Sequence, residues 1–580
     1  MTSIDSSERR ISTGVLVIGT GGSGLRAAIE LSERGVDVIA VGKRPKNDAH
    51  TSLAAGGINA ALGTMDADDS WQQHAADTLK ESYLLADPQT VQIVTEGAAR
   101  GIRDLERYGM PFAREDDGRI SQRFFGAHTY RRTAFAGDYT GLEIQRTLVN
   151  RAMQLEIPIL DTVYVTRILV DDEGVAFGAY GFDLVDGARY LIHADAVILA
   201  AGGHNRIWRR TSSRRDENTG DSFRLAVEAG GRLRDPELVQ FHPSGIIEPE
   251  SAAGTLISEA ARGEGGILRN ALGERFMSKY DPERMELSTR DRVALACYTE
   301  IKEGRGTPNG GVWLDVSHLP RETIMTRLPR VYQTMLELQM VDITTTPIEI
   351  APTAHYSMGG VWVRHEDHRT DVVGLYAIGE ASSGLHGANR LGGNSLIELL
   401  VYGRIVGEAA AEYSASLEAH RRSSSAIAAA RAEIDGLLAA DGAENVRALQ
   451  RAIRNVMTEY AGVVRDEQGL TRGLEELTAI EARIADVGVH PDIAGFQDLA
   501  HAFDLKSSAL AARATLEAAL ERRETRGCHN RSDFPDTDPG LQVNLVWSPQ
   551  TGVTREEIAP IPEEIAALMR EVSTAGKLVE

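Results

Sequence analysis

The sequence predicts an α/β protein with a discontinuous Rossmann-like nucleotide-binding domain, an inserted α+β capping domain, a C-terminal helical bundle and an irregular tail. Three observations predict this architecture. A glycine-rich turn joins an apolar strand to a helix near the N-terminus, two later apolar strands also end in glycine, and residues 408–526 are rich in Ala, Leu, Glu and Arg at helical spacing. At 580 residues the chain is too long for one hydrophobic core.

The composition limits the classes of function. Hydrophobic residues make up 42% and charged residues 25%, so the chain is expected to fold. A formal net charge of -22 argues against a nucleic-acid surface, although it is compatible with a local basic pocket for an anionic substrate. Cys297 and Cys528 are too few and too far apart for a disulfide framework, a zinc site or an iron–sulfur cluster, which fits a reducing cytoplasm.

No apolar run in the sequence approaches the roughly 20 residues of a membrane-spanning helix. Residues 1–12 are polar and mixed in charge, without the apolar core of a signal peptide. Any membrane contact is therefore expected to come through a partner.

The first element is a β-α-β unit made of a strand at 13–19, a helix at 25–34 and a strand at 36–41. The turn inside it reads Gly19, Thr20, Gly21, Gly22, Ser23 and Gly24. Its glycines permit a tight turn and let the backbone approach a pyrophosphate at a helix N-terminus, although the same turn could serve only helix packing. The second strand leads into Lys43, where an NAD site has an acidic residue, so a simple NAD site is not favoured. Glu380 is the alternative carboxylate for the sugar hydroxyls of a dinucleotide.

Two later strands, at 196–203 and 374–380, are expected to return to the same sheet. The nucleotide-binding domain is therefore predicted at 1–235 and 350–407, with the capping domain at 236–349 between its halves. The helical domain is predicted at 408–526. The tail, 527–580, contains five prolines, so an irregular course ending in a short helix near 563–571 is expected.

Six motifs occur in order along the chain. They are Asp48-Ala-His-Thr51, Gly56-Gly-Ile-Asn-Ala60, Gln240-Phe-His-Pro243, the segment 258–266 beginning Ser258-Glu259, His355-Tyr-Ser-Met-Gly-Gly360, and the segment 386–396, which includes Arg390. Together they resemble the succinate dehydrogenase/fumarate reductase flavoprotein family, which also includes L-aspartate oxidase. The resemblance runs from about residue 14 to about residue 535.

The resemblance implies FAD rather than NAD as the cofactor. The residues 19–24 fall on the pyrophosphate-binding positions, and the other implied FAD contacts are Lys43, His50, Thr51, Gly56, Gly57, Asp221, Glu380, Ser395 and Leu396. His50 matches the histidine that bonds covalently to the flavin in many members, and the alternative is a histidine that only forms a hydrogen bond nearby. No side chain carries a hydride reversibly, so a flavin is needed for this chemistry.

The same motifs imply the residues of a dicarboxylate site. A small dianion requires convergent cations and neutral donors, and the resemblance implies His242, Ser258, His355 and Arg390 for this role. Arg290 matches the family's general acid and base. Because an arginine resists deprotonation, a proton relay through Glu259 and Arg262 is expected to support it.

Two residues favour succinate and fumarate over L-aspartate within the family. His50 is typically absent from aspartate oxidases, and Phe125 stands where those enzymes tend to carry a Glu that meets the substrate ammonium. Ala55 departs from the Gln or Glu of many relatives, which leaves the preferred direction open.

The two cysteines cannot hold a cluster, so the resemblance implies a separate iron–sulfur subunit, a membrane anchor and a quinone, with the chain peripheral on the cytoplasmic face of the inner membrane. Two alternatives stay open. One is an L-aspartate oxidase that forms iminoaspartate, and the other is a non-catalytic flavin-binding or assembly protein, because fold alone does not secure function.

Overall fold

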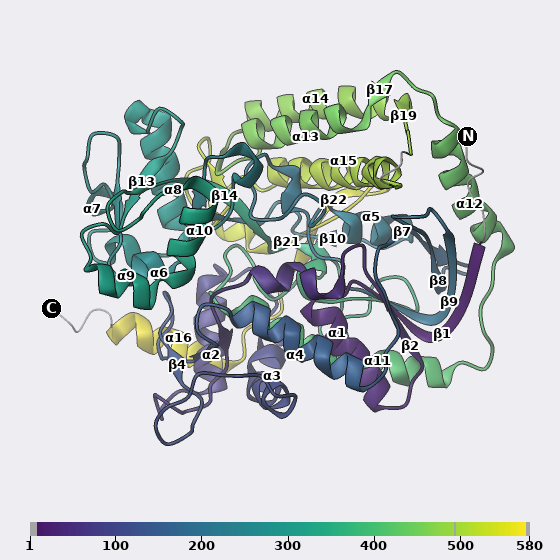
Figure 1. Ribbon diagram of the computed structural model, residues 1–580, viewed down its shortest axis with the longest axis horizontal. Helices are drawn as coiled ribbons and strands as arrows, with labels where there is room; N and C mark the ends of the chain where they lie inside the picture. Colours follow the sequence, from purple (N-terminus) through teal and green to yellow (C-terminus); the bar gives the residue numbers. More distant parts are fainter. Residues whose placement is uncertain (1–7, 492–494, 576–580) are drawn as a thin grey trace.

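The structure is a computed structural model that describes residues 8–491 and 495–575. The ends of the predicted first domain and tail, 1–7 and 576–580, lie outside the described residues. The main sheet has the strand order β6-β2-β1-β9-β8-β7, and β16 also pairs with β9 (Figure 1). Their bounds are β1 (Glu8–Ile18), β2 (Val38–Val41), β6 (Ile159–Leu160), β7 (Val163–Val170), β8 (Ala176–Asp183), β9 (Arg189–Leu199) and β16 (Leu375–Ala377).

The central strands of this sheet are parallel and buried on both faces. β1 runs parallel to β2 and β9, and β16 runs parallel to β9, so the predicted return of both later strands to the first sheet is confirmed. Successive side chains of β1 pack into the two hydrophobic cores on opposite faces of the sheet. Val15 and Val17 belong to one core, and Leu16 and Ile18 belong to the other. This alternation follows from the period of two in a strand and explains why β1 reads as a continuous apolar run.

Helices cover both faces of this sheet. On one side lie α1 (Gly22–Glu33), α3 (Pro88–Arg107), α4 (Thr140–Gln154) and α11 (Asn394–Ser416). On the other, α5 (Asp221–Glu228) and α12 (Ser424–Ala439) pack against β7. A small sheet, β3 (Ile58–Asn59), β5 (Thr133–Ala134) and β4 (Gln122–Arg123), packs on α11 through β3, and α2 (Trp71–Glu81) packs on α3.

A second sheet carries the segment predicted to cap the site. Its order is β11 (Val239–Ile246), β14 (Ile348–Ser357), β13 (Val312–Asp315) and β12 (Ile267–Arg269), and all its neighbours are antiparallel. It has its own core with α6 (Ala260–Gly263), α7 (Met277–Tyr280), α8 (Arg290–Glu300), α9 (Arg321–Arg327) and α10 (Pro329–Gln339). β14 continues across residue 349, so the predicted boundary falls inside a strand.

The helical segment packs α13 (Val446–Tyr460), α14 (Glu467–Ile484) and α15 (Gln497–Glu521) against one another, and α15 also contacts α5 (Figure 1). Ser423 caps the N-terminus of α12 by accepting a hydrogen bond from the Ala426 amide. α11 begins at Asn394 and packs on α1, so this long helix starts before the predicted domain boundary at 408.

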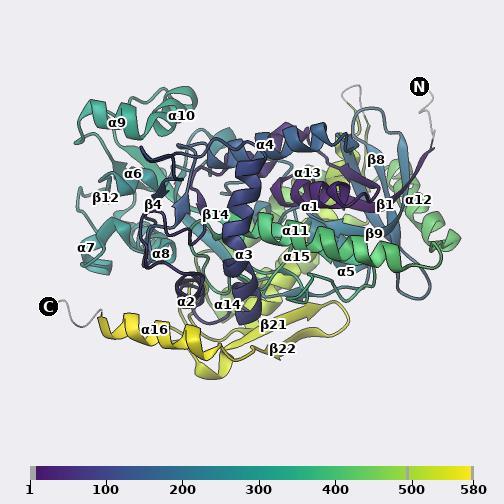
Figure 2. The same cartoon turned by 90° about the horizontal axis from the view of Figure 1, so that it is seen from below.

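The sequence predicts an irregular course for most of the tail, but the structure contains a regular hairpin there. β21 (Val543–Ser548) and β22 (Gly552–Glu557) form a hairpin that joins β10 (Leu233–Arg234) and β15 (Gly360–Val361) in one sheet (Figure 2). The prolines at 539, 549, 560 and 562 flank both strands and interrupt neither, because proline lacks the amide that a strand donates. The predicted terminal helix is present as α16 (Glu563–Ala575), which packs on α2.

Across the two described ranges, no helix is both long and apolar enough to cross a bilayer. Cys297 and Cys528 are buried free thiols, and within the same ranges no group of three or more His, Cys, Asp or Glu side chains is arranged to hold a metal ion.

Candidate active site

A single cavity of about 1690 Å³ contains nearly all of the predicted site residues. It extends from the glycine-rich turn at the edge of the main sheet to β11, β14 and α8 of the capping segment. Two predicted residues do not line it: Gly24, inside the first turn of α1, and Arg262, which lies behind Glu259.

The glycine-rich turn requires glycine at two positions for a steric reason. A Cβ at Gly24 would lie 1.9 Å from the Gly19 carbonyl oxygen, and Gly19 has a φ of 119°, which side chains disfavour. The N-cap residue of α1, Gly21, supplies no side-chain cap, and the first turn has no acidic residue. The positive end of the helix lies at the cavity beside Gly21 and Gly22, where the Gly22 amide donates to Thr51 Oγ1. This geometry suits a pyrophosphate.

Lys43 and Asp221 form an ion pair at the end of β2, with Nζ 2.7 Å from Oδ2. Tyr164 donates to the other Asp221 oxygen at 3.0 Å. Burial alone would raise the pKa of Asp221, but Lys43 overcomes it and lowers the pKa to about 2. The carboxylate stays ionised and can accept hydrogen bonds from a ribose.

Glu380 lies deeper in the cavity and accepts a hydrogen bond from the Ser357 amide at 3.0 Å. Asn205 and Asn218 also donate to its carboxylate, at 3.3 and 3.4 Å. Burial raises the pKa of Glu380, and His50 only partly opposes this effect.

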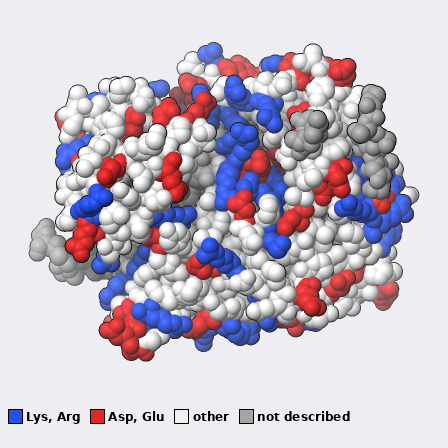
Figure 3. Space-filling model, viewed as in Figure 1, with Lys and Arg blue, Asp and Glu red and all other residues white. Residues whose placement is uncertain are grey.

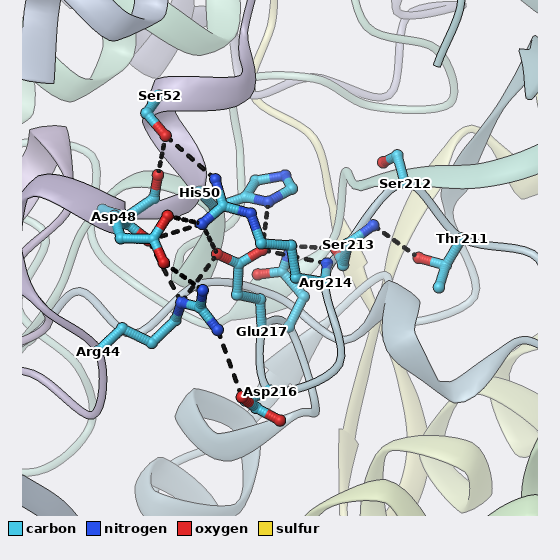
Figure 4. Close-up of polar contacts among 12 residues, drawn as sticks. Arg44, Asp48, His50, Ser52, Thr211, Ser212, Ser213, Arg214, Asp216 and Glu217 are labelled. Carbon is cyan, nitrogen blue, oxygen red and sulfur yellow. Dashed lines mark hydrogen bonds and ion pairs between the residues drawn. The ribbon is translucent and has the colours of Figure 1, made fainter. Parts of the chain in front are cut away.

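His50 begins the short helix η2 (His50–Leu53), and its ring lies in the cavity (Figure 4). Its Nδ1 is 2.9 Å from Oε2 of Glu217, a residue that the sequence motifs did not indicate. Thr51, the next residue, accepts a hydrogen bond from the Gly22 amide at 3.0 Å. The short helix is therefore tied both to the glycine-rich turn and to the loop 211–217.

In the other half of the cavity, Arg290 and Arg390 converge on Gln240. Arg290 Nη1 and Arg390 Nη2 donate to Gln240 Oε1 at 3.3 and 3.0 Å. Arg290 Nε also donates to Glu259 Oε2 at 2.9 Å, and Arg262 Nη2 lies 3.8 Å from the same oxygen. Burial opposes ionisation of Glu259, but the two arginines overcome it and lower the pKa of Glu259 to about 2.

Arg390 connects the two halves. Its Nη1 donates to Ser395 Oγ at 3.0 Å, and its Nη2 donates to His355 Nε2 at 3.2 Å. Its Nε is buried without a hydrogen-bond partner among the described residues. Burial, followed by repulsion from Arg290, lowers the pKa of Arg390 to about 10, so a nearby anion would stabilise its protonated form.

Both histidines of this half are neutral, because burial and the nearby arginines lower the pKa of His242 and of His355 well below the usual value. The Ser244 amide donates to His242 Nδ1 at 3.2 Å, so the proton of the neutral ring is on Nε2. The two rings meet edge to face, with centroids 5.4 Å apart. His242 thus offers a neutral N–H donor to an anion.

Ser258 and Phe125 complete the lining of this half. Ser258 Oγ accepts a hydrogen bond from the Ala260 amide at 3.3 Å, which leaves its hydroxyl proton available. The Phe125 ring lies close to Gly56 and Gly392. It presents an apolar surface to the cavity beside the guanidinium groups.

Sequence reasoning missed Gln240 and Glu217 as site residues. Gln240 stood inside a recognised motif, two residues before His242, and that position was an available signal. Glu217 lies in a loop between β9 and α5, and no pattern in the sequence connects it to His50.

The residues present fit FAD. The glycine turn and the N-terminus of α1 suit a pyrophosphate, Asp221 and Glu380 suit hydroxyl groups, and the cavity continues past His50 to an anion site. Arg390 Nε, which has no hydrogen-bond partner among the described residues, shows that this part of the cavity is suited to a further polar contact.

Comparisons with known proteins agree with this site. A profile for the FAD binding domain matches residues 14–396, and one described as "Fumarate reductase flavoprotein C-term" matches residues 450–561. A chain of the fumarate reductase (CoM/CoB) from Methanothermobacter marburgensis is 42% identical, over 92% of this chain and 98% of the relative. The succinate dehydrogenase flavoprotein subunit of Rickettsia bellii is 37% identical, over 94% and 97% of the two chains.

Solved structures give the same result. A chain of Mycobacterium smegmatis Sdh1 in complex with UQ1 superposes with a TM-score of 0.89 at 37% identity, covering 98% of each chain. A quinol fumarate reductase FrdA chain from E. coli gives 0.90 at 31% identity, covering 96% and 99%. This chain therefore belongs to the succinate dehydrogenase/fumarate reductase flavoprotein subunit family, whose members are FAD-dependent oxidoreductases.

Proposed function

We propose that this chain interconverts succinate and fumarate and exchanges the electrons with a separate iron–sulfur subunit. The observation that carries the proposal is the convergence of Arg290, Arg390, His242 and Ser258 on one cavity with the glycine-rich turn. Bound FAD supplies the two-electron chemistry that no side chain can perform reversibly. His50 is proposed as its point of covalent attachment.

The dicarboxylate is proposed to bind between the two arginines. Arg390 offers a planar guanidinium that can meet a carboxylate with two parallel hydrogen bonds, and its buried Nε has no other partner in the described chain. His242 and Ser258 add neutral donors. Because the site is buried, each of these charge-assisted bonds is stronger than it would be in water.

Arg290 is proposed to hold and deliver the proton that accompanies hydride transfer. Its Nε–H bond to the ionised Glu259 stabilises the protonated guanidinium between turnovers. Arg262 lies behind the same carboxylate, where its positive charge compensates when the proton of Arg290 is transferred. The relay Arg290–Glu259–Arg262 thus makes a transient loss of the proton from an arginine chemically reasonable.

Succinate is favoured over L-aspartate by the surroundings of the anion site. The ammonium group of L-aspartate would need a carboxylate as its ion-pair partner. Glu259, beside the two arginines of the anion site, already pairs with Arg290 and Arg262. Phe125 offers only an apolar ring at this position.

The electron partner is proposed from the relatives rather than from the cavity. The names of the relatives include CoM/CoB for the Methanothermobacter protein and UQ1 for the Mycobacterium complex. We infer that an iron–sulfur subunit and a membrane anchor connect this chain to quinone. A CoM/CoB fumarate reductase is the second candidate because of the 42% identity to the first relative.

The test is the anaerobic bleaching of the flavin absorption by succinate, beside an identical sample given L-aspartate. Bleaching by succinate alone supports the proposed reaction, and bleaching by L-aspartate would overturn it in favour of an aspartate oxidase. Copurification of an iron-containing chain then tests the proposed partner, and re-oxidation by quinone or by a CoM/CoB heterodisulfide distinguishes the two routes for electrons.

A further inference from the structure

A half-buried His50 and a buried Glu217 form a carboxylate–histidine pair that faces the cofactor cavity (Figure 4). Nδ1 and Oε2 are 2.9 Å apart, and the Glu217 side chain is only 6% exposed. The second carboxylate oxygen of Glu217, Oε1, has no hydrogen-bond partner among the described residues. We propose that Glu217 is the positioning residue that makes His50 Nε2 the nitrogen that bonds to the flavin.

The surroundings of Glu217 keep it negatively charged. The Arg214 amide donates to its Oε2 at 3.1 Å, and the guanidinium groups of Arg214 and Arg44 each lie 3.6 Å from its Oε1. Burial alone would raise the pKa of Glu217, but His50 and Arg214 overcome it and lower the pKa to about 2. At any physiological pH this carboxylate is therefore only an acceptor.

An ionised acceptor at Nδ1 determines the tautomer of the ring. The Nδ1 proton is held between His50 and Glu217, so in the neutral ring the lone pair is on Nε2. A mixture of tautomers, which an unpaired histidine would show, is thereby excluded. Only the nitrogen with the lone pair can form a new bond to carbon.

The loop that carries Glu217 is itself fixed against the segment that carries His50. Arg214 donates to the Asp48 carbonyl at 2.9 Å and to Ser52 Oγ at 3.2 Å, on both sides of His50. Asp48 also forms ion pairs with Arg214 and Arg44. The pair is thus held by contacts between two loops rather than by the histidine alone, which is how a rigid positioning group is built.

The inference rests on the proposed attachment at His50, in which one bond forms and one bond breaks. Nε2 forms a bond to the 8α-methyl carbon, one C–H bond of that methyl group breaks, and its hydrogen leaves as a proton. The two electrons of the broken bond pass to a two-electron acceptor, either fumarate or dioxygen. While Nδ1 keeps its proton, the alkylated imidazole is a cation, and Glu217 faces that charge.

The same pair predicts how attachment depends on pH. Burial would lower the pKa of His50, but Glu217 overcomes it and raises the pKa. Nε2 loses its proton, and gains its lone pair, only as the pH rises through this raised pKa. The charged or titratable groups that face His50 are Glu217, Arg214, Arg44, Glu380 and His355.

The test replaces Glu217 with Gln (Glu217→Gln), which keeps the shape and removes the charge. The full-length protein, produced without flavin, is mixed with FAD, and covalent flavin is followed by fluorescence of the denatured chain and by the mass of the His50 peptide. Wild-type protein is expected to attach FAD about tenfold or more faster than Glu217→Gln at about pH 8.5, with similar total flavin bound.

The matched control is Asp216→Asn, which removes the neighbouring carboxylate. Asp216 pairs with Arg44 at 3.3 Å and does not contact His50, so its variant is expected to attach FAD at the wild-type rate. Equal rates for Glu217→Gln and Asp216→Asn would overturn the inference. If Glu217→Gln does not fold, the rate of FAD attachment to the wild-type protein is measured between about pH 6 and about pH 9. The rate is expected to rise with pH, and a rate independent of pH would contradict the role of Nε2.

Failure of the inference can be separated from failure of the proposed function. Equal rates of covalent attachment at His50 in both variants, with bleaching by succinate, would overturn only the role of Glu217. Wild-type flavin that is fully released on denaturation would overturn the proposed attachment as well as this inference. The succinate reaction itself is measured separately by the bleaching.

Discussion

At the level of single residues, the two arginines of the anion site are separated from each other by one amide oxygen. Gln240 Oε1 accepts from both guanidinium groups, while Gln240 Nε2 donates to Asn389 at 2.8 Å and to the Arg390 carbonyl at 3.1 Å. Two like charges in a buried site repel each other, and the shared acceptor compensates part of that cost. Gln240 therefore fixes the spacing between the proposed proton donor and the proposed carboxylate ligand.

The first prediction concerns Arg290. Replacing it with Lys (Arg290→Lys) removes the fork that reaches both Glu259 and Gln240, so kcat for succinate oxidation is expected to fall by about 10³-fold while flavin is retained. The matched control is Arg292→Lys, whose side chain is 62% exposed on the same helix. Steady-state kinetics with an artificial acceptor measure both, and near-normal turnover of the first variant would remove Arg290 from its role.

The second prediction concerns Gln240. In Gln240→Glu a carboxylate stands between the two arginines, where it competes with the substrate for their charge. KM for succinate is expected to rise by about tenfold or more, with a smaller effect on kcat. Rates measured over a range of succinate concentrations check this, and an unchanged KM would show that Gln240 has no part in holding the two arginines for the dianion.

At the level of elements, the N-terminus of α1 depends on the close approach of Gly24 to Gly19. In Gly24→Ala the new methyl group would lie 1.9 Å from a carbonyl oxygen, so the turn must open. We expect the flavin content to fall at least tenfold and the melting temperature to fall as well. Flavin absorption and thermal denaturation measure the two effects.

Gly436 provides the control for this change. It lies within α12, and a Cβ there has no heavy atom within 4 Å. Gly436→Ala should leave flavin binding unchanged and stabilise the helix by up to about 1 kcal/mol, because Ala is the better helix former. A Gly24→Ala protein that binds flavin like Gly436→Ala would contradict the steric argument for the turn.

The elements also show which parts of the fold could be read from the sequence. The β-α-β unit could be predicted, since β1 and β2 are apolar runs and the turn between them is rich in glycine. The hairpin β21–β22 could not, because five prolines in the tail suggested an irregular course. Its strand β21 is recognisable only once β10 is known to pair with it, and that pairing joins residues more than 300 positions apart.

At the level of the whole molecule, the candidate site was predictable where motifs marked it. His242, His355 and Arg390 come from distant segments of the chain. The family resemblance predicts that they share one site, and it does so without knowledge of the pairing between β11 and β14. Glu217 could not be predicted in this way, because its significance is a single contact between two loops. Contacts of this kind depend on the tertiary fold and leave no periodicity in the sequence.

The whole molecule also has an uneven distribution of charge. The chain carries a formal net charge of -22, yet basic side chains gather in the hollow at the centre of one face (Figure 3). Within the described residues, nine arginines that line the cavity form no ion pair: Arg206, Arg209, Arg210, Arg215, Arg330, Arg390, Arg447, Arg451 and Arg454. Burial, followed by repulsion from Arg454 and Arg215, lowers the pKa of Arg206 to about 10, so these positive charges act on one another.

We call these cavity-lining arginines without an ion pair the positive rim. The positive rim of a protein with negative net charge is expected to attract a dianion toward the cavity, and salt screens such attraction. We predict that kcat/KM for succinate falls about threefold or more when the ionic strength is raised from about 0.01 M to about 0.3 M. In the double variant Arg447→Gln/Arg451→Gln, kcat/KM at low salt should be lower and its salt dependence weaker. Arg472→Gln, an exposed change outside the cavity, should keep the wild-type dependence. Parallel salt curves for all three proteins would mean that the rim does not guide the substrate, and that its charges serve the cofactor or a partner.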